Sequence, residues 1–154
     1  SSMAPDSKTW KPPMLFHFRV DFQWKGDKAS ASFAEVDGLG QEFVLDGHVT
    51  KSDRAPGYPK GIKQDDIVLK RAIEPLNEKI TSWLRDCFNF RDTGWIETCT
   101  VIISLLDEEN KVAARWVGVR AIPIKWKSAG PNADKSEIAT ETITLRHTKL
   151  IRNK

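Results

Sequence analysis

Two carboxylates, Glu35 and Asp37, occupy alternate positions at the end of a strand-like segment, immediately before Gly38-Leu39-Gly40. Alternate residues of a strand point to one face, so the two acids would lie side by side. Such a pair could act on a substrate as general acid and general base. The same spacing is usual where a strand ends in water, because Asp and Gly favour the turn that follows. We favour the second interpretation, in which the acids belong to a strand end.

The other residues that could carry chemistry are few and scattered. The three histidines, His17, His48 and His147, each lack a His, Cys or carboxylate at the spacing of common metal sites. Cys87 and Cys99 have apolar neighbours, so we expect both to be reduced packing residues. Nucleophile-elbow, phosphate-loop and zinc-helix motifs are missing from the sequence. The sequence therefore predicts no catalytic residue, no metal site and no cofactor, and indicates a protein that is not an enzyme.

The composition is that of one ordinary globular domain. The chain has 154 residues, of which 40% are apolar and 29% charged, as is typical of a single domain. Its 24 basic and 21 acidic residues give a net charge of +3, which is too balanced to indicate nucleic-acid binding. No segment reaches the roughly 18 consecutive apolar residues of a membrane helix, and no leader resembles a signal peptide. We expect synthesis in the cytoplasm and no membrane insertion by this chain.

The first residues differ in composition from the rest of the chain. Residues 1–13, SSMAPDSKTWKPP, are mostly small, polar or proline, which is typical of segments that do not join a core. We therefore expect a flexible N-terminal arm over residues 1–13, with Trp10 as its one candidate anchor. Residues 14–151 are expected to form a single β domain.

Alternation of apolar and polar residues dominates that domain. In residues 15–22, for example, four apolar side chains alternate with His17, Arg19 and Asp21, as in a strand with one buried face. Similar segments, separated by turn-forming residues, give about eight expected strands: 15–22, 29–37, 41–49, 65–71, 95–107, 111–119, 121–126 and 136–151. The last of these has threonines along one face, which are polar yet favour strands.

One helix interrupts the strands, and one long segment shows no periodicity. Pro75 suits the first position of a helix, and apolar residues then recur at steps of three and four at Leu76, Ile80, Trp83, Leu84 and Phe88. Residues 47–64 are rich in Pro and Gly and are expected to be a loop, of a length that is usually functional. The sequence predicts a mainly β fold, an antiparallel β-sandwich or barrel of about eight strands with one flanking α-helix.

A series of short motifs resembles a known family. In chain order they are Phe33-x-Glu35-Val36-x-Gly38-Leu39, Pro56-Gly57, Ile67-x-Leu69-Lys70-Arg71, Trp83, Leu105-Leu-Asp107, Trp116, Ala121-x-Pro123-x-Lys125-Trp126 and Glu137-Ile-Ala-x-Glu141-x-Ile143-x-Leu145-x-His147. Together they resemble the tail tube proteins of contractile-tailed bacteriophages and related contractile injection systems, over roughly residues 14–151. Ala72 stands where that family often has Gly. The strength of the resemblance lies in the order of the motifs.

The resemblance implies a structural subunit and a set of partners. It implies a tail-tube-like β-sandwich protomer that forms hexameric rings, which stack into a hollow inner tube within a contractile sheath. The implied partners are further copies of the chain, a sheath protein, a baseplate or spike hub, and cargo protein or DNA in the lumen. The implied location is a phage tail, or an extracellular or cell-associated injection particle. Ring closure would also cover strand edges that otherwise invite random pairing.

Under this resemblance, three groups of residues become candidate sites. The long loop is expected to contact the next ring through Lys51, Arg54, Pro56, Gly57, Tyr58 and Lys60. A tube that conducts cargo needs a wetted inner wall, for which the polar candidates are Ser30, Ser32, Glu42, Asp46 and His48. Glu35 and Asp37 are expected to serve the contact between protomers, paired with Arg or Lys across the ring. The alternative interpretations are a disordered surface loop for the first group, an ordinary solvated strand face for the second, and a strand end exposed to water for the third.

Two other functions fit the same residues. A tube-initiating baseplate adaptor would share the fold but occupy one end of the tube. A small-molecule-binding β-barrel would enclose an apolar ligand within an interior rich in Trp, and would be a monomer with a cavity. Rings or stacks in solution would separate the tube subunit from such a barrel.

Overall fold

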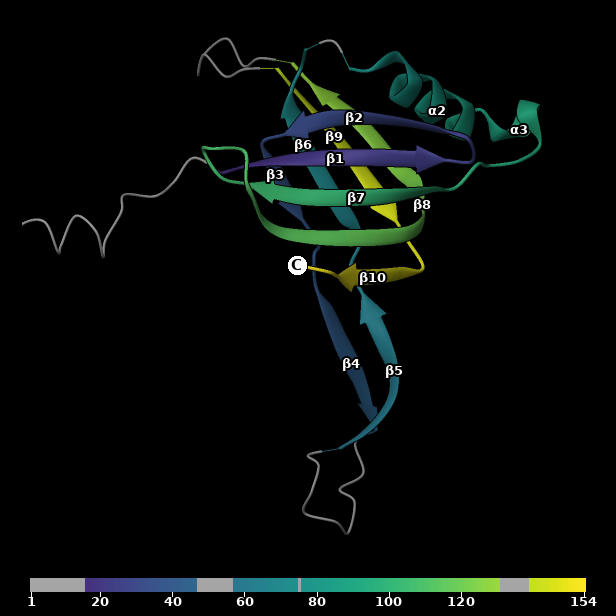
Figure 1. The fold of residues 1–154 in the computed structure, drawn as a ribbon. Helices are drawn as coiled ribbons and strands as arrows, with labels where there is room; N and C mark the ends of the chain where they lie inside the picture. Colours follow the sequence, from purple (N-terminus) through teal and green to yellow (C-terminus); the bar gives the residue numbers. More distant parts are fainter. Residues whose placement is uncertain (1–15, 47–56, 75, 131–138) are drawn as a thin grey trace, which may run out of the picture.

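The computed structural model describes residues 16–46, 57–74, 76–130 and 139–154 (Figure 1). The predicted mainly β fold with antiparallel strands and a flanking helix is confirmed. The elements are β1 (His17–Trp24), β2 (Asp27–Phe33), β3 (Glu35–Asp37), β4 (Gln41–Asp46), β5 (Tyr58–Gln64), β6 (Ile67–Ala72), α2 (Glu78–Phe88), α3 (Phe90–Thr93), β7 (Cys99–Leu106), β8 (Val112–Ala129), β9 (Thr140–Arg146) and β10 (Lys149–Arg152).

The long strand β8 belongs to two layers of the sandwich. Its first half pairs with β7 and β10, and its second half, from Ile122, pairs with β9. We call β2-β1-β7-β8(first half)-β10 the front layer, and β8(second half)-β9-β6-β3 the back layer. The strands of the two layers cross in Figure 1. Arg120 has φ +52°, a left-handed conformation that bends the strand without ending it. The two strands predicted at 111–119 and 121–126 are therefore one.

Apolar side chains from both layers fill the space between them. The front layer contributes Val20 and Phe22, and the back layer contributes Leu69, Ile143 and Leu145, all fully buried. These residues alternate with outward-facing polar ones, as the sequence pattern of β1 predicted. The interior is thus packed with side chains, which argues against the alternative of a barrel that encloses a ligand.

Helix α2 packs against the sandwich through one face, but it begins later than predicted. The first helical residue is Glu78, after the N-cap Asn77, whose side chain accepts a hydrogen bond from the backbone N–H of Lys79. Leu76 therefore precedes the helix, and Pro75 lies outside the described residues. The apolar stripe is otherwise as expected, with Ile80, Trp83 and Leu84 buried.

The stripe ends in a surface residue. Phe88 is 48% exposed and stacks on Trp126 with ring centroids 6.4 Å apart.

Neither of the helices in the described residues is long and apolar enough to cross a membrane.

Three further boundaries differ from the prediction. The segment 29–37, which was expected to be one strand, divides at Ala34 into β2 in the front layer and β3 in the back layer. Residues 58–64 were expected to be loop but form β5, which pairs with β4 in a separate two-stranded hairpin. The sequence did not indicate this strand because it contains Pro59 and Gly61, which are unusual within strands. Pro is tolerated at the edge of a hairpin, and the register shifts beside Pro59, between Val44 and Leu45. The predicted strand 136–151 divides at His147 and Thr148 into β9 in the back layer and β10 in the front layer.

Candidate assembly surfaces

The β4–β5 hairpin projects from the body of the protein (Figure 1) and carries exposed apolar side chains. Phe43 is 62% exposed and lies opposite Ile62, which is 57% exposed, while Tyr58 at the start of β5 is 66% exposed. Large apolar side chains gathered on a projecting element are typical of a surface that another protein covers. The hairpin is therefore the first candidate assembly surface.

The two faces of the hairpin differ: one carries Phe43 and Ile62, and the other carries the charged residues Glu42 and Lys63 together with the exposed Val44. Phe43 and Ile62 lie two positions from the paired residues Gln41 and Gln64, so all four share a face. On the opposite face Glu42 lies across from Lys63, with 3.8 Å between the carboxylate oxygen and the ammonium nitrogen. The apolar face is thus distinct enough to be altered without touching the ion pair.

The base of the hairpin is fixed to the body by hydrogen bonds to the β9–β10 segment. The Gln64 side-chain amide donates to the Thr148 carbonyl at 2.9 Å, and the Gln41 amide donates to the Leu150 carbonyl. The Nε2 atom of His147 lies 3.1 Å from the Asp65 carbonyl. These contacts join the two strands of the hairpin to a strand of the front layer, which fixes the direction in which the hairpin projects.

A glycine and an ion pair complete this joint. Gly38 has φ +84°, and a Cβ atom there would lie 1.9 Å from the Asp66 carbonyl oxygen. The Asp66 carboxylate accepts two hydrogen bonds from the Arg146 guanidinium, each 3.0 Å long. The hydrogen bond from Arg146 is the main reason that the pKa of Asp66 lies below its usual range. The turn predicted at Gly38 is thus also a point of close backbone packing.

Glu35 and Asp37 lie on β3 with both side chains exposed, while Val36 between them packs toward the core. Among the described strands β3 pairs only with β6, where Glu35 lies opposite Lys70 and Asp37 opposite Val68. The acids therefore share a face, as the spacing predicted, and they mark one edge of the back layer.

The outer face of the back layer is polar and carries mostly short side chains or lysines. The strand register places Thr142 of β9 between Lys70 of β6 and Lys127 of β8, and Thr144 between Val68 and Lys125. Thr140 lies between Ala72 and Ala129 in the next row. This face is the second candidate surface, and it is the threonine face that the sequence indicated.

The structure separates the predicted lumen candidates. Ser30 and Ser32 lie on β2 of the front layer, and the Ser30 hydroxyl donates to the Asp21 carboxylate. Glu42 and Asp46 belong to β4 of the hairpin, which is not in the same sheet as β2. His48 lies outside the described residues.

The predicted stacking residues fall in part on the hairpin. Tyr58 and Lys60 are exposed residues of β5, and Gly57 immediately precedes them. Lys51, Arg54 and Pro56 lie outside the described residues. Phe43 and Ile62 were not among the candidates, because alternation alone does not distinguish an apolar face turned to a core from one turned to a partner.

The described residues contain no group of three or more His, Cys, Asp or Glu placed to hold a metal ion. Both cysteines are free and buried, as expected. Burial is the main reason that the pKa of the Cys87 thiol rises to about 11, and it raises the pKa of Cys99 further. These thiols are packing residues rather than nucleophiles.

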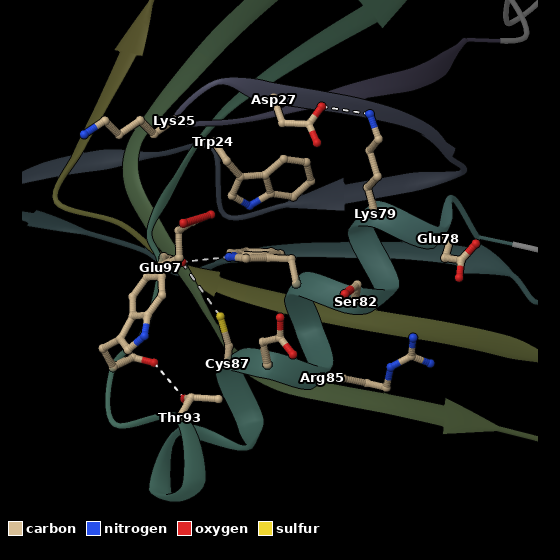
Figure 2. A pocket seen from close by; sticks show the side chains of 13 residues that line it. Trp24, Lys25, Asp27, Glu78, Lys79, Ser82, Arg85, Cys87, Thr93 and Glu97 are labelled. Atoms are coloured by element: carbon tan, nitrogen blue, oxygen red, sulfur yellow. Dashed lines mark hydrogen bonds and ion pairs between the residues drawn. The ribbon is translucent and has the colours of Figure 1, made fainter.

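A cleft of about 680 Å³ lies beside α2, α3 and the β1–β2 turn, outside the space between the layers (Figure 2). Lys79 pairs with Asp27 at 2.8 Å on its wall. The Glu97 backbone carbonyl accepts two hydrogen bonds, one from the Trp83 indole N–H at 2.7 Å and one from the Cys87 thiol at 3.8 Å. Internal contacts therefore occupy part of the polar wall of this cleft.

Comparison with known proteins places the chain in a family. Residues 15–151 match the family model of the T4-like virus tail tube protein gp19. No match was found among curated proteins.

Solved structures share the fold at low sequence identity. A chain of the 6-fold symmetrised anti-feeding prophage (AFP) baseplate is 17% identical, with 93% of this chain and 96% of that chain covered and a TM-score of 0.72. A chain of the PVC sheath-tube complex, from an extracellular contractile injection system, is 20% identical, with 99% and 97% covered and a TM-score of 0.65. Hcp1 from Flavobacterium johnsoniae is 13% identical, with 87% and 94% covered and a TM-score of 0.57.

The family match confirms the resemblance seen in the motifs, and with it a structural role rather than an enzymatic one. The match extends over nearly the whole described β domain. This chain belongs to the T4-like virus tail tube protein gp19 family, and its structural role is that of a tail tube protein.

Proposed function

We propose that six copies of this chain form a ring, and that the rings stack into the inner tube of the particle. The observation that carries the proposal is the projecting hairpin with exposed Phe43 and Ile62, which finds no cover within the described part of the protomer. Family membership supports a tube. The 6-fold symmetry of the AFP baseplate supports the number of copies in a ring.

The back layer is the better candidate for the wall of the bore. Its outer face is formed mainly by threonines, alanines and charged residues, with Val68 among them, and such a largely polar surface would keep a water-filled channel wetted. The outer face of the front layer includes Ile102 and Val117 side by side, beside Ile151, which is 38% exposed. Apolar residues of this kind suit contact with another protein. Under this proposal Ser30 and Ser32 face away from the bore.

The hairpin is the proposed contact between rings. Figure 1 shows that it continues away from the body roughly along the strands β3 and β6 of the back layer. If those strands line the bore, the hairpin reaches toward the neighbouring ring. Burying an apolar side chain such as Phe43 or Ile62 contributes about 1.5 to 3 kcal/mol, so two per protomer and six protomers per ring give a substantial stacking energy. Gly57, Tyr58 and Lys60 belong to the same proposed contact, and so do Lys51, Arg54 and Pro56, which lie outside the described residues.

The proposed partners follow from the relatives. The PVC chain comes from a sheath-tube complex and the AFP chain from a baseplate. We therefore assign the outside of the tube to a sheath protein, its end to a baseplate or spike hub, and the bore to cargo protein or DNA.

Electron microscopy of hairpin variants tests the stacking. The wild-type protein is expected to give rings and stacked rings at high concentration. Replacing Phe43 and Ile62 with Ser removes the apolar face, so the double variant is expected to form single rings. The matched control replaces Glu42 and Lys63 with Ala on the opposite face and should stack like the wild type. Stacks of unchanged length from the Phe43→Ser, Ile62→Ser variant would contradict the proposed role of the hairpin.

The same images distinguish a main tube subunit from a tube-initiating adaptor. An adaptor would give single rings in the wild-type protein, because one of its ends would bind the baseplate or spike hub instead of another copy. Folded monomers at all concentrations would contradict both roles.

A further inference from the structure

The two edges of the back layer carry opposite charges. At one edge, β3 presents Glu35 and Asp37 on the outer face. At the other edge, the second half of β8 presents Lys125 and Lys127 on the same face, while Trp126 between them packs inward. All four charged residues are exposed. Within the described residues none of them forms an ion pair.

Both edges are also open for pairing. Among the described strands, β3 pairs only with β6, and β8 from Ile122 to Ala129 pairs only with β9. Each edge therefore has backbone N–H and C=O groups available to another strand. Because every pair in the layer is antiparallel, β3 and the second half of β8 run in opposite directions. A β3 strand placed beside β8 by rotation about a ring axis would continue the antiparallel pattern.

The register places the opposite charges at matching levels. In one row across the layer, Glu35 lies opposite Lys70, Lys70 lies opposite Thr142, and Thr142 lies opposite Lys127. In the next row, Asp37 lies opposite Val68, Val68 lies opposite Thr144, and Thr144 lies opposite Lys125. The acidic edge and the basic edge thus have the same two-residue spacing and face the same side of the layer.

We propose that the acidic edge formed by Glu35 and Asp37 on β3 binds the basic edge formed by Lys125 and Lys127 on β8 of a second copy of this chain. This inference rests on the proposed ring. The contact joins two different edges, which is the head-to-tail type that closes into a ring by rotation. It also disfavours wrong pairs, because two β3 edges would oppose acid to acid and two β8 edges base to base.

Two variants with inverted edges test the contact. In the first, Glu35→Gln and Asp37→Lys make the β3 edge basic; Gln is used at position 35 because Glu35 lies opposite Lys70 in the same protomer. In the second, Lys125→Glu and Lys127→Gln make the β8 edge acidic, with the new acid in the same row as position 37. Each variant then has two edges of like charge, so we expect ring formation to weaken at least roughly tenfold for each one alone.

Mixing the two variants provides the decisive measurement. In an equimolar mixture, each edge of one variant meets an oppositely charged edge of the other, and a ring of six accommodates alternating subunits. We expect native mass spectrometry to show mixed rings containing three copies of each variant, and light scattering to show ring formation restored. Rescue by mixing requires both variants to be folded and cannot arise from a purely structural role of the four residues.

A charge reversal outside the two edges serves as the control. Glu108→Lys reverses a charge on the exposed β7–β8 turn and should leave rings unchanged. Rings from either edge variant alone at wild-type strength, or two variants that fail alone and also fail when mixed, would overturn the edge contact. If the wild-type protein forms no rings, the proposed function itself fails, which is distinguishable from failure of the edge contact in a protein that does form rings.

Discussion

The two thiols of this protein show how position alters residue chemistry. The Cys87 thiol on α2 donates to the Glu97 carbonyl, and Cys99 lies at the start of β7. Burial is the largest cause of the raised pKa of each thiol, with the Asp86 carboxylate adding to the effect on Cys87 and Cys87 itself adding to the effect on Cys99. The reactive species of a cysteine is the thiolate, so both residues are held in their unreactive form.

Thiol labelling measures this effect directly. With a pKa of about 11, about one Cys87 in a thousand is a thiolate at pH 8, compared with roughly a quarter for a free cysteine. We expect a disulfide reagent to label the native Cys99→Ser variant about a hundredfold more slowly than the same protein in denaturant. Labelling should accelerate as the pH rises toward 11. Equal rates in the native and denatured protein would contradict the buried position of Cys87.

Residue spacing revealed only one side of the candidate ring contact. The shared, exposed face of Glu35 and Asp37 follows from alternation along a strand, and the sequence indicated it. Lys125 and Lys127 alternate in the same way, but nothing local shows that they lie at the opposite edge of the same layer. That relation depends on the order in which four strands pair, which alternation does not encode.

At the scale of elements, the direction of the hairpin depends on how closely β3 and the start of β6 approach. Gly38 permits this approach because it has no side chain to meet the Asp66 carbonyl. The same backbone carries the Asp66 side chain that binds Arg146. A displacement of this carbonyl would therefore disturb the ion pair and the base of the hairpin together.

Substitution at Gly38 tests this joint. Gly38→Ala adds the cost of a left-handed residue, about 1 to 2 kcal/mol, and a clash with the Asp66 carbonyl. Gly26→Ala is the matched control, because Gly26 has φ +81° but open space around its Cβ position. We expect Gly38→Ala to lower the free energy of unfolding more than Gly26→Ala and to increase amide exchange in β4 and β5. Equal destabilisation by the two substitutions would show that contact with Asp66 is unimportant.

Element boundaries were predicted well where a strand has one buried face and poorly elsewhere. The pattern of β1 was evident because its apolar side chains enter the core. Strand β5 was missed because its alternation includes Pro59 and Gly61, and because its apolar face lacks a core to face. Strand β8 was divided at Arg120, where the chain bends but the ladder continues into the other layer. In both strands the pairing with neighbouring strands, which local preference does not reveal, decides the backbone.

At the scale of the whole molecule, assembly and stability are expected to be coupled. A ring or stack binds the folded chain and not the unfolded one, so association raises the apparent stability with protein concentration. We expect the melting temperature of the wild-type protein to rise between dilute and concentrated samples. The Phe43→Ser, Ile62→Ser variant should keep the part of this rise due to ring formation and lose the part due to stacking. A melting temperature independent of concentration in a protein that forms rings would contradict this coupling.

The fold class could be predicted from the sequence, whereas the topology could not. Alternation over most of the chain indicated antiparallel strands around one core, and one apolar stripe indicated the helix. The order β2-β1-β7-β8-β9-β6-β3 joins strands that are far apart in the chain, such as β6 and β9. Only the complete packing of the two layers selects that order from the others that the same strands permit.

Because β8 bends at Arg120 and continues into the other layer, it would transmit force between the two layers of a subunit in the proposed tube. One continuous backbone runs from the front layer into the back layer, so the two walls of the protomer are linked by covalent bonds as well as by side-chain packing. If the back layer lines the bore, as proposed, a thrust applied to the outside of the tube would reach its inner wall along this strand. Sliding of one layer past the other would require β8 to break its pairing with β7 or β9, so in the proposed tube we expect each subunit to resist that motion.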